Sequence, residues 1–238
     1  MTASRRVGIL GGMFDPVHNG HVDVLMAAQA ALELAEIFVV PASIPPHRPP
    51  PAASSYHRFA MLALAIADRL GWQALDLELQ DPMPSYTSKT LRQFQAQGFG
   101  ATELFFLSGA DAFLEITAWQ DYPTLLDMAH FAVISRPGVP VGALPARFPS
   151  LAPRMHEPRD AGLPSGATLI FLIDAQTADV SSTAIRRRRA QHQSIAGLVP
   201  PLVQQHIERH RLYQDAMAAV EAGLAATGQP ADGLHGRR

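Results

Sequence analysis

Short apolar runs alternate along the chain with stretches in which apolar residues recur at helical spacing. Apolar runs predict strands over 7–10, 36–40, 103–107, 130–135 and 169–173, and strict alternation predicts another over 74–79. Helical spacing predicts helices over 22–34, 56–70, 85–97, 122–128, 181–191 and 200–213. The first helix places Val22, Leu25, Met26, Ala30 and Leu34 on one face. This order predicts the α/β class, with a doubly wound, Rossmann-like parallel sheet and a small C-terminal helical part.

Three segments depart from this alternation. The proline-rich stretch 45–51 cannot form a helix or a central strand and is expected to be a loop. Residues 139–166 are rich in Pro, Gly and Arg with little periodicity, so we expect a surface excursion. Residues 214–238 are rich in Ala and Gly, and we expect a flexible tail. Residues 1–213 are therefore predicted to form one domain.

Composition and charge restrict the classes of partner. Apolar residues make up 47% of the 238 residues, which is enough to fill a core, and the formal net charge is −2. A charge near zero gives no bulk attraction to nucleic acid or to a membrane, and we expect neither as a partner. Cysteine is absent, which excludes disulfides and thiolate metal sites. No apolar stretch is long enough for a signal peptide or a membrane span, so a cytoplasmic location is expected.

The segment between the first strand and the first helix carries the clearest chemical pattern. Gly11 and Gly12 lack side chains, so backbone N–H groups there can approach a phosphate closely. The helix that follows Gly20 directs the positive end of its dipole to the same place. His18 and His21 are three residues apart across the helix start and can face one anion. The segment is therefore interpreted as a phosphate-binding turn.

Three other structures could contain such a turn: a P-loop, a dinucleotide-binding fingerprint and an ordinary strand–helix turn. It is not a P-loop, because no Gly-Lys-Ser/Thr follows, and its glycines lack the spacing of a dinucleotide fingerprint. An ordinary strand–helix turn, capped by Asp15 and containing two incidental histidines, would explain a glycine pair alone. It does not explain Gly-Gly, Phe-Asp-Pro and His-x-Gly-His occurring together.

The stretch from Gly11 to His21 resembles the signature of the nucleotidyltransferase superfamily that has a His-x-Gly-His motif. Near the C-terminus, 180–186 resembles its second signature, Ser-Ser-Thr-x-Ile-Arg. Further stretches resemble bacterial nicotinate-nucleotide adenylyltransferases: 45–48, 84–87, 109–111, Trp119 and 135–138. The resemblance runs from about 7 to 213 and implies the nucleotidyltransferase fold.

The resemblance implies transfer of AMP from ATP to nicotinate mononucleotide, which gives deamido-NAD and pyrophosphate in NAD biosynthesis. The phosphate of the mononucleotide attacks the α-phosphorus of ATP in line, so no protein nucleophile is required. Mg²⁺ is expected as a cofactor bound through the ATP phosphates. A protein-held metal is not expected, because His18 and His21 lack a third ligand.

The resemblance also implies roles for individual residues. His18 and His21 correspond to the catalytic histidines. The residues matching the ATP site are Gly11, Gly12, Phe14, Gly20, Arg136, Ser182, Thr183 and Arg186. Those matching the nicotinate mononucleotide site are Asp15, His47, Thr87, Asp111 and Trp119.

Several of these residues also admit purely structural roles. Ser182 and Thr183 could simply cap a helix, as could Asp111, and an isolated Trp119 would more often belong to a core. Gln120 stands where some relatives have an aromatic residue, so the resemblance does not define which residues form the pyridine pocket.

Two alternatives to the function stay open at this point. The first keeps the reaction but uses nicotinamide mononucleotide or another phosphorylated small molecule as the acceptor. The second is a catalytically inactive, nucleotide-binding regulatory module. The histidine pair argues against the module, because binding alone would not require it. The sequence indicates no oligomeric state.

Overall fold

The computed structural model describes residues 5–44, 49–81, 83–158 and 166–214. They form one sheet of seven strands in which all neighbours are parallel. Its spatial order is β3 (Trp72–Ala74), β2 (Glu36–Pro41), β1 (Val7–Gly12), β4 (Leu104–Gly109), β5 (His130–Ile134), β7 (Ile170–Ile173) and β6 (Met155–His156). This order confirms the predicted doubly wound sheet.

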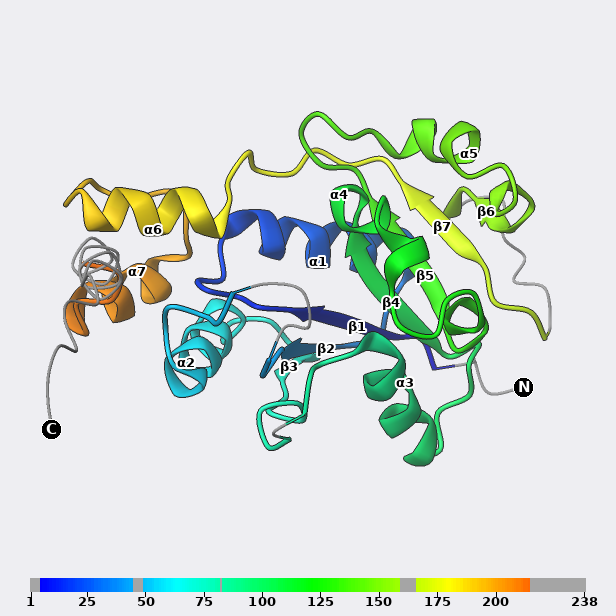
Figure 1. The fold of residues 1–238 in the computed structure, drawn as a ribbon, viewed down its shortest axis with the longest axis horizontal. Coiled ribbons are helices and arrows are strands. Elements are labelled where there is room, and N and C mark those ends of the chain that lie inside the picture. Colours follow the sequence, from blue (N-terminus) through cyan, green and yellow to red (C-terminus); the bar gives the residue numbers. More distant parts are fainter. Residues whose placement is uncertain (1–4, 45–48, 82, 159–165, 215–238) are drawn as a thin grey trace, which may run out of the picture.

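Helices cover both faces of the sheet (Figure 1). One face packs against α1 (Asn19–Leu32), α2 (Ser55–Ala65), α6 (Ser182–Ala190) and α7 (Pro201–Arg209). The other packs against α3 (Thr87–Ala96), α4 (Ala110–Phe113), α5 (Leu144–Arg147) and the short helices 116–118, 124–127, 141–143 and 152–154. Alternation along β1 separates the two cores, because Ile9 belongs to one and Leu10 to the other.

Two local predictions were wrong. The strand expected over 74–79 ends at Ala74, and the chain then turns where the N–H of Leu79 donates to the carbonyl of Asp76, 2.8 Å away. The helix α1 buries Val24, Leu25, Ala28 and Leu32, whereas Met26 is 44% exposed. Apolar residues occur all round this alanine-rich helix, so periodicity alone did not determine which side faces the sheet.

The expected surface excursion is also corrected. The described part of 139–166 contains α5 and the edge strand β6, and its Val141, Leu144 and Leu151 are buried. The elements are too short to show a periodic pattern, which explains why they escaped prediction. The tail expected at 214–238 lies outside the described residues beyond Gln214.

The sheet divides between β1 and β4. Pairing of these strands ends at Leu10 and Leu107, after which β1 continues beside β2 and β4 continues beside β5. Gly11 and Gly12 are therefore the last residues of β1 and not part of a turn. In open α/β sheets, ligands bind where the strand order reverses, outside the carboxyl ends of the strands. The structure thus points to the segment after Gly12 as the candidate site.

None of the helices that the structure describes is long and apolar enough to cross a membrane.

Candidate functional site

Two stacked imidazoles stand at the start of α1. His18 is the N-cap residue, and its ring lies parallel to that of His21, with centroids 3.7 Å apart and planes at 23°. The N–H of His18 donates to Nδ1 of His21 over 3.2 Å. In its neutral form His21 therefore carries its proton on Nε2, which makes that atom a hydrogen-bond donor.

Both imidazoles are held in the neutral form. Burial and the nearby charge of Arg136 lower the pKa of His18 to about 4. Burial, together with charge on His18 and Arg136, lowers the pKa of His21 well below its usual value. Near neutral pH each ring is consequently an uncharged donor, and Arg136 supplies the positive charge.

Arg136 follows β5 and reaches across to α1 and the segment before α6. Its Nη1 donates to the carbonyl of Gly20 and its Nη2 to that of Val180, both over 3.3 Å. A Cβ atom on Gly20 would lie 2.7 Å from Nη1 of Arg136 and 3.1 Å from the carbonyl oxygen of Ala178. Glycine at this position thus lets the guanidinium lie against the start of the helix beside the histidines.

Two backbone donors at the start of α1 already have partners. The N–H of Asn19 donates to Leu198 and that of His21 to the carbonyl of His18. These two N–H groups of the first turn of α1 therefore already have partners within the protein.

Asp15 anchors this segment from inside the protein. Its side chain is 1% exposed, and its carboxylate accepts hydrogen bonds from the N–H groups of Ala52 and Ala53 and from the hydroxyl of Tyr213, at 2.7, 3.1 and 2.8 Å. Arg186 lies 3.8 Å from its Oδ2. The carboxylate thus has its hydrogen-bond partners inside the protein, and the expected contact of Asp15 with nicotinate mononucleotide stays a prediction.

The backbone carbonyls after β1 are held by side chains from distant parts of the chain. Arg58 donates to Met13 over 2.9 Å, and Arg186 donates to Asp15 over 2.6 Å. Ser182 donates to Pro16 over 2.9 Å. We call residues 13–16, with these acceptor carbonyls, the held turn. Each donor comes from a different position in the sequence, so the shape of this turn depends on the folded domain.

The second signature lies beside the held turn, as expected. In Figure 1, α6 lies next to the start of α1. The hydroxyl of Thr183 accepts from Nη2 of Arg186 over 3.3 Å, and Ser181, not Ser182, caps α6 by accepting from the N–H of Ala184. Phe14 is 2% exposed, and its ring packs edge-on against that of His21, with the ring centroids 5.0 Å apart. The buried Phe14 side chain therefore supports the His21 ring.

The described residues expected at the acceptor site come from α3, α4 and the segment that follows α4. Asp111, in α4, is 59% exposed and lies 3.9 Å from Nε of Arg136. Trp119 is half-buried and packs edge-on against Phe106. The Phe106 ring in turn lies beside Gly11, where an added Cβ atom would be 3.6 Å from it. Thr87 is the first residue of α3 and is also half-buried. His47 lies outside the described residues.

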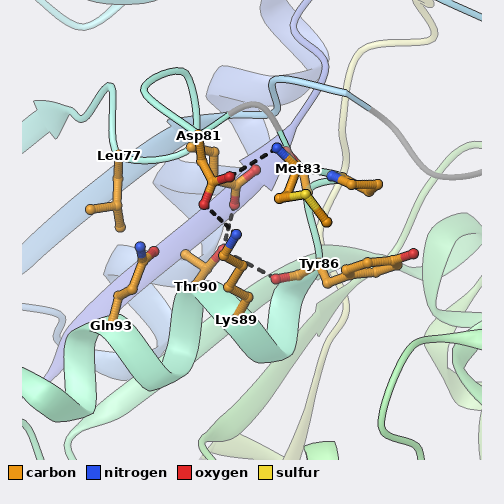
Figure 2. A pocket seen from close by; sticks show the side chains of 10 residues that line it. Leu77, Asp81, Met83, Tyr86, Lys89, Thr90 and Gln93 are labelled. Atoms are coloured by element: carbon orange, nitrogen blue, oxygen red, sulfur yellow. Dashed lines mark hydrogen bonds and ion pairs between the residues drawn. The ribbon is translucent and has the colours of Figure 1, made fainter.

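A small pocket lies beside α3 (Figure 2). Lys89 pairs there with Asp81, and Thr90 donates to Glu78. Burial raises the pKa of Glu78. The charged groups of this pocket therefore have partners within the protein, which link the segment before α3 to its first turns.

No sequence pattern indicated two residues that contact the held turn, Arg58 and Tyr213. Arg58 is 2% exposed inside α2, and Tyr213 follows α7. Neither lies in a motif, and both act over long sequence separations. In the part of the chain that the structure describes, no three His, Asp or Glu side chains form a group that could hold a metal ion.

Comparison with known proteins gives the family. Residues 9–188 match the family described as cytidylyltransferase-like. A probable nicotinate-nucleotide adenylyltransferase from Cronobacter sakazakii is 39% identical over 207 residues, covering 87% of this chain and 94% of the relative. The chain belongs to the nicotinate-nucleotide adenylyltransferase family. The adenylyltransferase of Salmonella typhimurium is 36% identical over 209 residues, covering 87% of this chain and 97% of its own.

A solved structure confirms the fold of the adenylyltransferase. The nicotinic acid mononucleotide adenylyltransferase of Plasmodium falciparum, complexed with NaAD, matches with a TM-score of 0.68 and 20% identity, covering 90% of this chain and 99% of that one. The resemblance inferred from the two signatures is thus confirmed. The assignment of single side chains to ATP or to the acceptor stays a prediction.

The buried histidines make the stability of the adenylyltransferase depend on pH. His130, at the opposite end of the sheet, also has its pKa lowered to about 4 by burial. Between about pH 4 and 6.5 an unfolded histidine binds a proton that the folded one does not, so the free energy of unfolding falls as pH is lowered through this window. From pH 7 to pH 5 the loss is about 2 kcal/mol for His18 and about the same for His130, because the folded pKa of each is about 4.

Urea unfolding at pH 7 and pH 5 checks this prediction with the variant His130→Gln. The glutamine can still accept from the N–H of Leu169, which His130 does over 2.9 Å, but it does not titrate. We expect the variant to lose about 2 kcal/mol less than the wild type between the two pH values. An equal loss in both proteins would contradict the expected role of His130.

Proposed function

We propose that the protein transfers AMP from ATP to nicotinate mononucleotide, with His18, His21 and Arg136 acting on the ATP phosphates. The observation that carries this proposal is the neutral, stacked histidine pair beside the Arg136 guanidinium, at the point where β1 and β4 separate. Membership of the adenylyltransferase family supports the same reaction.

In the proposed reaction, an oxygen of the mononucleotide phosphate forms a bond to the α-phosphorus of ATP. The bond from that phosphorus to the bridging oxygen breaks, and pyrophosphate leaves. Negative charge grows on the oxygens around the phosphorus and on the leaving group. Hydrogen bonds from two fixed imidazoles, with one guanidinium, stabilise this charge without reorganising at the moment of reaction.

The other proposed contacts follow from position. Thr183 is exposed at the start of α6, close to the held turn, and Ser182 supports ATP binding through its bond to Pro16. Asp111 projects beside Arg136 toward solvent, where it can accept from a ribose hydroxyl of the acceptor. Trp119 offers a half-buried ring for stacking on the pyridine.

Mg²⁺ is proposed to enter with ATP. The donors nearest the proposed phosphate position are nitrogen atoms of His18, His21 and Arg136, which suit phosphate oxygens, whereas Mg²⁺ takes oxygen ligands. The ion would therefore be held by phosphate oxygens and water. Bound there, it neutralises charge on the phosphates.

The acceptor is proposed to be the nicotinate form because α3 begins at Thr87. The first N–H groups of a helix lack intrahelical partners, and its dipole favours a negative charge at that end. A carboxylate gains from both effects, whereas a neutral carboxamide gains little. We expect kcat/KM for nicotinate mononucleotide to exceed that for nicotinamide mononucleotide by roughly tenfold or more.

A steady-state assay of pyrophosphate release with ATP and each acceptor measures this ratio. Equal or faster turnover of nicotinamide mononucleotide would change the acceptor and leave the reaction class intact. If pyrophosphate is released from ATP with neither acceptor, the protein is better described as a nucleotide-binding module than as an enzyme.

A further inference from the structure

The C-terminal end of the domain is bonded to the interior of the held turn. The hydroxyl of Tyr213 donates to Oδ1 of Asp15 over 2.8 Å, between residues 198 positions apart. Tyr213 is 8% exposed. The helix α7 that precedes it packs against α2 through buried Val203 and Ile207, and the His57 and His206 rings meet there, with Nδ1 and Nε2 3.1 Å apart.

Two features separate this contact from ordinary packing. Tyr213 has a φ of 65°, and Phe14, next to Asp15, has a φ of 47°. Bulky residues rarely adopt this left-handed region, so the surrounding structure must stabilise it at some energetic cost. Burial and the charge of Asp15 raise the pKa of Tyr213, so the phenol remains protonated and always donates.

We propose that Tyr213 is a positioning residue for ATP, acting through Asp15 on the turn that precedes the catalytic histidines. This inference rests on the proposed function for its kinetic consequences. Asp15 joins the backbone of 52–53, the Tyr213 hydroxyl and Arg186 at one buried point. Losing one of these partners would let the turn shift. Because His18 lies only three residues after Asp15, such a shift would displace the histidine as well.

The test compares Tyr213→Phe with a matched variant, Thr168→Val. Thr168 is 8% exposed, and its hydroxyl, at the opposite end of the sheet, donates to the carbonyl of Leu126 and accepts from Nη2 of Arg154, both over 2.7 Å. Tyr213→Phe removes one buried hydroxyl with one hydrogen bond, and Thr168→Val removes one with two, so the control should lower stability at least as much as Tyr213→Phe. Of the two residues, only Tyr213 makes a hydrogen bond to the held turn.

We expect Tyr213→Phe to lower kcat/KM for ATP roughly tenfold, the scale of one hydrogen bond to a charged group, while KM for the acceptor changes less than about twofold. Calorimetric titration with ATP alone should show weaker binding in this variant, and amide exchange over 13–17 should quicken. Thr168→Val should leave all three quantities as in the wild type.

The outcomes separate this inference from the proposed function. If the wild type releases no pyrophosphate with any acceptor, the proposed reaction is wrong. The ATP affinity and the amide exchange rates of Tyr213→Phe then still test the role of Tyr213. If Tyr213→Phe loses stability but retains wild-type ATP affinity, kinetics and exchange, the residue is merely structural and the inference is overturned.

Discussion

Replacing His18 with alanine is expected to lower kcat by a factor of roughly one hundred to one thousand, the scale of losing one preorganised donor to the transition state. The ring is 3% exposed and neutral, so the lost contribution is a hydrogen bond from a fixed position and not a charge. KM for the acceptor should change little, because the imidazole is proposed to act on the ATP phosphates. Steady-state pyrophosphate release measures both constants.

Two further variants make the result specific. His18→Gln retains an N–H donor on a side chain of different shape and should recover part of the lost rate. His156→Ala removes a half-buried histidine from the edge strand β6 and should retain wild-type kcat. A kcat for His18→Ala within about fivefold of the wild type would mean that the histidine is structural, since a transition-state donor contributes far more.

Replacing Asp15 with alanine is expected to lower the free energy of unfolding by about 3–5 kcal/mol, the range for removing one partner of a buried ionic group. The change leaves the N–H groups of Ala52 and Ala53 and the hydroxyl of Tyr213 without their acceptor. It also leaves Arg186 without its buried counter-charge. Urea unfolding monitored by circular dichroism measures the loss.

Asp127→Ala is the matched control for this prediction. Asp127 also pairs with an arginine, Arg154, at 2.8 Å, but its side chain is 68% exposed. An exposed ion pair contributes less than about 1 kcal/mol. If Asp15→Ala costs no more than Asp127→Ala, the buried carboxylate does not anchor the turn, and the role inferred for Tyr213 loses its basis.

The strands and most helices could be predicted because each has a local cause. Short apolar runs indicated β1, β2, β4, β5 and β7, and the two signatures indicated the starts of α1 and α6. The prediction failed where the pattern was short or ambiguous, as in β3 and over 139–166. There, packing against the sheet decided the conformation.

The sequence alone determined the chemistry of the site, because His18 and His21 follow a strand and start a helix within one continuous segment. It also determined the family, through two signatures in the expected order. Only the tertiary structure showed that the Asp15 carboxylate is buried and bonded inside the protein, and that Arg58 and Tyr213 bond to the turn before the histidines. Those roles depend on burial and on contacts between residues far apart in the chain, and no local pattern records either.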